Sequence, residues 1–215
     1  MDSLLNYFII IHVIAGTAAL IFGAIAFTLR SKTPKHKPIG RIYFWCMTVV
    51  FVTGIILSVA KSLVFFFFIA VFSYYSVVIA YRALRLKELH KGQKPKAIDW
   101  IIQLLAALVF LSAIIFAWTG DRGGASVIMT VFGVLGLLGV YRNTKLLLKG
   151  PKETNYWLKM HIGHMMGSYI GAITAFLVNQ TDHIPIHPLI LWFGPTVLLV
   201  PIIVMEFRKI KSEPF

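Results

Sequence analysis

The chain has 215 residues, of which 58% are hydrophobic and only 13% are charged, and its formal net charge is +13. Soluble domains carry about 25% charged residues, so this composition argues against a water-soluble globular protein and favours one that lies in a lipid bilayer. The basic excess would indicate nucleic-acid binding in a soluble protein, but beside such apolar sequence it needs a membrane explanation, and we expect no nucleic-acid partner.

Seven apolar segments are each long enough to form a membrane-spanning helix, which needs about 20 residues to cross the hydrocarbon core. They cover residues 4–29, 42–60, 62–81, 99–119, 124–147, 158–179 and 188–207. The second and third segments follow each other almost directly at Lys61, which predicts a tight helical hairpin. The sequence therefore predicts an all-α polytopic membrane protein, a seven-transmembrane-helix bundle in which residues 1–215 form a single domain.

Basic residues are concentrated in alternate connections between these segments. The basic connections contain Arg30, Lys32, Lys35, Lys37 and Arg41; Arg82, Arg85, Lys87, Lys91, Lys94 and Lys96; Arg142, Lys145, Lys149, Lys152 and Lys159; and Arg208, Lys209 and Lys211. The charged residues of the N-terminus and of the other connections are only Asp2, Lys61, Asp121, Arg122 and Asp182. Cytoplasmic loops are enriched in Lys and Arg, so we expect the N-terminus outside and the C-terminus in the cytoplasm. Anionic lipids of the cytoplasmic face are the expected partners of these loops.

Small residues at steps of three and four positions predict which faces of the first and sixth segments pack against other helices. These faces carry His12, Gly16, Ala19, Gly23 and Ala26 in the first segment, and His161, His164, Ser168, Gly171, Ala172 and Ala175 in the sixth. Helices in lipid approach each other closely through such residues. Both histidine-bearing faces are therefore expected to point into the bundle.

Three histidines form a candidate metal site near the cytoplasmic face. His36 lies in the loop before the second segment, and His161 and His164 lie one helical turn apart near the start of the sixth. Three neutral imidazoles and a water make an open catalytic zinc site, and ionisable side chains in membrane spans indicate function. The structural alternative is that His161 forms hydrogen bonds at headgroup level and His164 bonds a neighbouring helix; proton transfer or substrate contact is a third interpretation.

His12 is expected to be a separate, outer cofactor ligand. It lies roughly 9 Å from His164 in depth, too far for one ion to join them directly. Arg41 would neutralise an anionic cofactor, such as the propionates of a b-type haem, or a lipid group. In the last outer connection, Asp182, His183 and His187 are either a second metal site or solvated loop residues.

The stretches IHVIAGTAALIFGAIAF, HKPIGRIYFWCMTVVFVTGIIL and HIGHMMGSYIGAITAF resemble a family of bacterial predicted membrane proteins, domain of unknown function 2306. The matching residues are His12, Gly16 and Gly23; His36, Gly40, Arg41 and Tyr43; and His161 with His164. The resemblance implies a location in the bacterial inner membrane and brings no established activity.

Three functions follow from these patterns. The first is a multi-pass inner-membrane protein that binds zinc or haem b through its intramembrane histidines. The second is a transporter of small molecules or ions, or a receptor-like bundle, with a histidine-lined polar cavity. The third is a zinc-dependent membrane hydrolase, which is weakened because the inner side offers only Ser168 and no intramembrane carboxylate beside the histidines.

Overall fold

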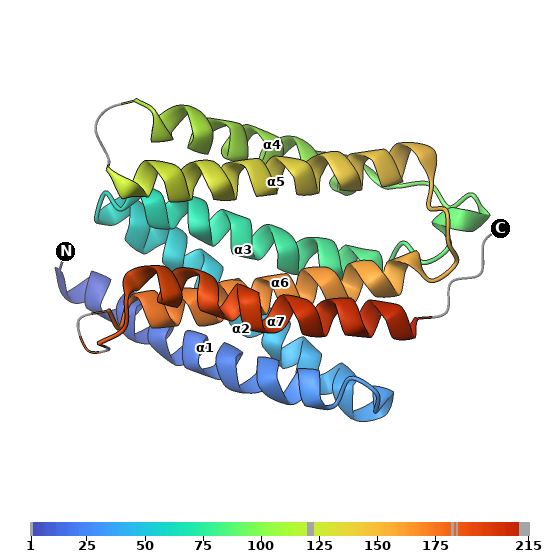
Figure 1. Cartoon of the computed structure of the whole chain (residues 1–215), viewed down its shortest axis with the longest axis horizontal. Helices are drawn as coiled ribbons and strands as arrows, with labels where there is room; N and C mark the ends of the chain where they lie inside the picture. The colour runs from blue at the N-terminus through green and yellow to red at the C-terminus, as the bar shows by residue number, and fades with distance from the viewer. Residues whose placement is uncertain (1, 120–122, 182, 184, 211–215) are drawn as a thin grey trace. The chain divides into compact units, whose positions relative to one another are not determined.

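The computed structural model is helical throughout the regular elements of the residues it describes, which are 2–119, 123–181, 183 and 185–210 (Figure 1). The elements are α1 (Asp2–Thr28), α2 (Thr33–Ala60), α3 (Val64–Ala83), the short 3-10 helix η1 (Leu89–Lys91), α4 (Ala97–Ala117), α5 (Gly124–Lys149), α6 (Tyr156–Val178) and α7 (Pro188–Lys209). Each predicted segment corresponds to one long helix. Asp121, Arg122, Asp182 and Lys211, which contributed to the sequence predictions, lie outside the described residues.

Six of these helices, all except α6, are long and apolar enough to cross a membrane. Helix α6 is less apolar because it carries Lys159, His161 and His164 together with several glycine and hydroxyl residues. The prediction of an all-α protein is confirmed for the described residues, and six of its helices have the length and apolar character that a membrane span needs. Three finer statements stay predictions: that α6 is a seventh span, that the N-terminus lies outside and the C-terminus in the cytoplasm, and that the membrane is the bacterial inner membrane.

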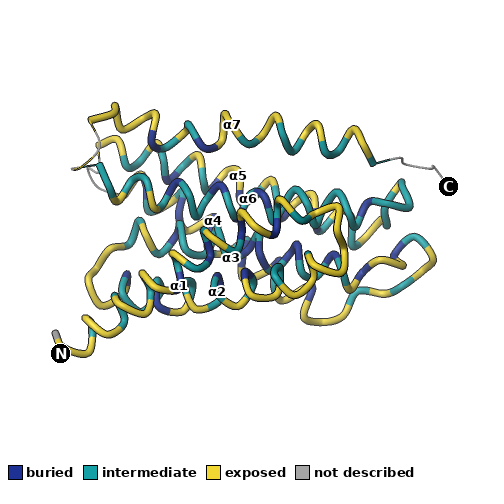
Figure 2. The backbone as a smooth tube through the Cα atoms, turned by 90° about the horizontal axis from the view of Figure 1, so that it is seen from below, coloured by how far each residue is buried: buried dark blue, intermediate teal, exposed yellow. Residues whose placement is uncertain are grey.

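Helix α4 shows why lipid is the expected surroundings of these helices. Its buried face begins with Asp99 and Gln103. Its outer face carries Leu104, Leu105 and Leu108, which are 61%, 57% and 56% exposed. A helix on the surface of a water-soluble protein has the opposite arrangement, with its apolar stripe inward. Exposed residues likewise run along most of α7 (Figure 2), where Leu191 and Pro195 are buried.

The chain divides into two compact units, whose boundaries fall within α3, α6 and α7. Unit 1 comprises Met1–Val77 and Met166–Val204, and unit 2 comprises Val78–Met165 and Met205–Phe215. In unit 1, α1 packs along α2; in unit 2, α4 packs along α5 (Figure 1). The single transmembrane domain expected for residues 1–215 stays a prediction.

In unit 1, the small-residue face of α1 receives aromatic side chains from α2 and α6. A Cβ atom on Gly23 would lie 2.5 Å from the ring of Tyr169 and 3.1 Å from the ring of Tyr43. The hydroxyls of Tyr43 and Ser168 share a buried hydrogen bond of 2.8 Å, and the Tyr169 hydroxyl donates to the carbonyl of Leu20 at 3.0 Å. The expectation that the small residues face other helices is therefore confirmed for Gly23 and Ser168.

In unit 2, the α4–α5 contact depends on Gly136. A Cβ atom there would lie 2.5 Å from the ring of Phe110, which is 1% exposed. We expect Gly136→Ala to lower the free energy of unfolding by about 1–3 kcal/mol, because the added methyl would overpack the contact with the buried ring. SDS-induced unfolding of the purified protein measures this. The matched control is Gly167→Ala, where the added methyl meets nothing within 4 Å; an equal loss in both variants would contradict the close contact.

Candidate functional site

A buried ion pair joins the last turn of α3 to the first turn of α4 in unit 2. Arg82 Nε donates to Asp99 Oδ1 at 2.6 Å, and Arg82 Nη2 donates to Asp99 Oδ2 at 2.8 Å. The Asp99 side chain is 3% exposed and the Arg82 side chain 18%. Asp99 Oδ2 also accepts the backbone N–H of Lys96 at 2.8 Å, which caps the start of α4. These charge-assisted bonds offset the cost of removing the carboxylate from water.

Further polar side chains lie beside this ion pair around a small cavity of about 20 Å³. Gln103 and Asn143 are both 5% exposed and line it from α4 and α5. Tyr156, at the start of α6, lines it too; its buried hydroxyl lies beside the backbone amide of Leu89 but makes no hydrogen bond of good geometry within the described part of the chain. We call Arg82, Asp99, Gln103, Asn143 and Tyr156 the polar cluster. A cavity of this volume has room for about one water molecule or small ion.

The rest of the cavity wall is apolar. It is formed by Ile79, Ala83, Leu86, Leu89, Leu146, Leu147 and Met160. Leu86, Leu89 and Tyr156 belong to one buried hydrophobic cluster. Such walls lower the local dielectric constant, so the polar contacts inside are stronger than in water and an unsatisfied polar group is more costly.

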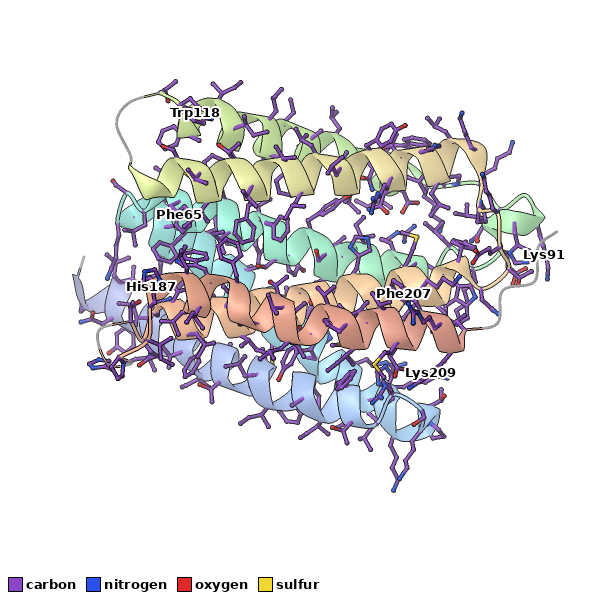
Figure 3. All side chains as sticks on the ribbon, viewed as in Figure 1. Phe65, Lys91, Trp118, His187, Phe207 and Lys209 are labelled. Carbon is purple, nitrogen blue, oxygen red and sulfur yellow. The ribbon has the colours of Figure 1, made fainter. Side chains whose placement is uncertain are left out.

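The polar cluster lies at one end of its helices. Tyr156 is the first residue of α6, and Arg82 is next to last in α3. Gln103 is the deepest cluster residue on α4, roughly 9 Å from the start of that helix. Within unit 2, Lys91 in the α3–α4 connection and Trp118 after α4 are labelled at opposite ends (Figure 3). The cluster therefore lies toward the end with the basic connection, which the sequence assigns to the cytoplasmic side.

None of these residues is a candidate site residue by sequence pattern. Asp99 is a buried carboxylate in the first turn of a helix that is long and apolar enough to span a membrane. Arg82 counts in the sequence only as a basic loop residue. The available signal was the four-residue step from Asp99 to Gln103, which places both on one face of an apolar helix.

Two of the predicted metal-ligating histidines form hydrogen bonds to helix ends. His36 lies within α2, which begins at Thr33, so its assignment to a loop is wrong. Its Nδ1 donates to the carbonyl of Ala26 in the last turn of α1 at 2.9 Å. His161 Nδ1 donates to the carbonyl of Ala80 in the last turn of α3 at 3.1 Å. The last carbonyls of a helix lack intrahelical partners, so both imidazoles stabilise a helix terminus.

His12 joins α1 to α2 in unit 1. Its Nδ1 lies 2.8 Å from the hydroxyl oxygen of Thr53, which itself donates to the carbonyl of Val49 at 2.7 Å. Because the Thr53 hydrogen is used in that bond, its oxygen accepts from His12. His164 is half-buried on α6, and Arg41 is exposed on α2.

His183 and His187, in the connection between α6 and α7, are both exposed. His187 Nδ1 accepts the backbone N–H of Leu189 at 3.3 Å, at the start of α7. This bond gives His187 the role of a helix N-terminal cap. Asp182, the third member of the predicted outer site, lies outside the described residues.

The described residues contain no group of three or more His, Cys, Asp or Glu side chains placed to hold a metal ion. His36 belongs to unit 1, whereas His161 and His164 belong to unit 2. The zinc site at these three residues, and a haem site involving His12 and Arg41, therefore gain no support from the structure and stay predictions.

Comparisons with known proteins add no identity to this geometry. No protein-family model, no curated protein and no solved structure matches the chain. The resemblance to domain of unknown function 2306 accordingly stays an expectation, and the function has to be argued from the polar cluster itself.

Proposed function

We propose that the protein is a polytopic membrane transporter of small inorganic ions, and that the polar cluster of unit 2 is its ion-facing site. The observation that carries this proposal is the water-sized cavity that the Arg82–Asp99 pair, Gln103, Asn143 and Tyr156 line among apolar walls. Polar and charged side chains inside apolar helices are costly, and in membrane proteins they commonly mark ion and substrate pathways.

The side chains of the cluster suit a small ion that has lost part of its water shell. The amides of Gln103 and Asn143 carry both donors and acceptors, and the Tyr156 hydroxyl can act as either. The Arg82–Asp99 pair can open toward an ion of either sign, because an entering cation replaces the guanidinium at the carboxylate and an entering anion replaces the carboxylate at the guanidinium. The cavity volume of about 20 Å³ favours inorganic ions over larger solutes.

Flux through proteoliposomes tests this function. Vesicles with the purified protein are loaded in turn with fluorescent reporters for protons, K⁺, Na⁺ and Cl⁻, and flux is compared with that of protein-free vesicles. We expect wild type to accelerate the flux of at least one ion, and Asn143→Leu to slow it about tenfold, as for the loss of one hydrogen bond to a charged group.

The matched control is Ser112→Ala, because Ser112 is exposed on α4 and its hydroxyl donates only to the nearby carbonyl of Val109 among the bonds described. This variant should keep the wild-type flux. If vesicles that contain the wild-type protein show the same flux as protein-free vesicles for all four ions, the proposed function is ruled out.

A further inference from the structure

A second depression in unit 2, distinct from the cavity of the polar cluster, opens at the surface of the α3–α4 connection. It has a volume of about 440 Å³ and is lined by Tyr81, Arg82, Arg85, Leu86, Gln93, Lys94 and Lys96. We call it the basic groove. Four of its lining residues are cationic and, among these described residues, none is acidic. Arg82 and Leu86 also line the cavity of the polar cluster, so the two spaces adjoin.

The positive charge of the groove is largely uncompensated. Arg82 is neutralised by Asp99, but Arg85, Lys94 and Lys96 are all exposed. Glu88 is the acidic residue within positions 84–96, and it pairs with Lys91 at 3.0 Å. The hydrogen bond from Lys91 lowers the pKa of the Glu88 carboxyl.

The wall of the groove is held in place by hydrogen bonds. Gln93 Nε2 donates to the carbonyl of Arg85 at 2.8 Å, and Gln93 Oε1 accepts the backbone N–H of Glu88 at 3.0 Å. Arg85 Nη2 donates to the hydroxyl of Tyr81 at 2.9 Å. Gly92 makes the turn with φ of 85°, which a side chain would disfavour. A site fixed before binding loses less conformational freedom when its ligand arrives.

From this juxtaposition we propose that the basic groove, with Lys94 and Lys96 as its principal cations, binds a phosphate-bearing anion, and that the phosphate belongs to the headgroup of an anionic phospholipid. The volume of about 440 Å³ is that of a pocket for a small organic ligand and exceeds the need of a bare phosphate. The adjacent Lys87 ammonium stacks over the ring of Trp157 at 4.1 Å, an aromatic residue of the kind that lies at headgroup level.

The test measures how tightly the purified 215-residue chain, in a neutral detergent, binds each of three probes. The probes are short-chain phosphatidylglycerol, short-chain phosphatidylcholine and inorganic phosphate. We expect phosphatidylglycerol to bind more tightly than phosphatidylcholine. The double variant Lys94→Gln/Lys96→Gln should weaken the binding of phosphatidylglycerol by about thirtyfold, because each lysine near the surface contributes roughly fivefold to the affinity. Both lysines are exposed, so the double variant should fold; its elution from a sizing column checks this.

The control variant is Lys149→Gln, which removes an exposed charge at the end of α5, away from the groove lining. It should leave the affinity for phosphatidylglycerol unchanged. Tighter binding of phosphatidylglycerol than of inorganic phosphate supports a lipid source. Equal binding of both, lost in the double variant, supports the phosphate site but overturns the lipid assignment. Equal affinities for all three probes would overturn the site. So would the same affinity for phosphatidylglycerol in the double variant and in Lys149→Gln.

Discussion

Asp99→Leu is expected to lower the free energy of unfolding by about 3–5 kcal/mol, because it leaves the Arg82 guanidinium largely buried without its carboxylate. It also removes the side-chain acceptor for the Lys96 backbone N–H at the start of α4. SDS-induced unfolding measures both effects together. Asp99→Asn separates them, because the amide oxygen still accepts from Lys96 while the negative charge is lost.

A double-mutant cycle identifies the ion pair as the source of this loss. Arg82→Met strands the carboxylate and should cost a similar amount to Asp99→Leu, but Arg82→Met/Asp99→Leu should recover much of the stability, because no unpaired charge remains. Additive losses in the double variant would mean that the two side chains stabilise unit 2 independently, contrary to the bidentate contact.

Gly23→Leu is expected to cost about 3 kcal/mol in unit 1, at the upper end for an overpacked site. The new side chain would displace the ring of Tyr169, which lies only 2.5 Å from where a Cβ atom of residue 23 would stand, and would break the bond from the Tyr169 hydroxyl to Leu20. SDS-induced unfolding again gives the value. Ala24→Leu is the matched control, because Ala24 is the next residue of α1 and is exposed. A loss of the same size at Ala24 would indicate an effect of side-chain size on α1 alone rather than on its packing.

The helices could be predicted from the sequence because the length of an apolar run determines whether it can cross a bilayer, whatever its neighbours are. The start of α2 could not. The stretch TPKHKPIGR is charged and contains two prolines, which favours a loop, yet α2 begins at Thr33 with Pro34 in its first turn. Proline is tolerated there because a first-turn N–H has no intrahelical partner. His36 consequently lies on a helix.

The candidate site was less accessible to sequence reasoning because it depends on pairings between helices. Arg82 and Asp99 are 17 positions apart, and the fold of the α3–α4 connection brings them together. The structural alternative for the histidines expected a hydrogen bond at headgroup level from His161 and a bond to a neighbouring helix from His164; in the structure His161 itself bonds a neighbouring helix. Its partner, the carbonyl of Ala80, depends on how α6 lies against α3, which the pattern of small residues does not specify.

Ion flux compared between Gln103→Leu and His36→Gln/His161→Gln tests most directly whether the polar cluster, rather than the histidines, is the functional site. Proteoliposomes of equal protein content are used, with the ion to which wild type is most permeable. We predict that Gln103→Leu loses about tenfold in flux and that the double histidine variant, once shown to be folded, keeps the wild-type rate. Loss of flux in the histidine variant with full flux in Gln103→Leu would contradict the assignment.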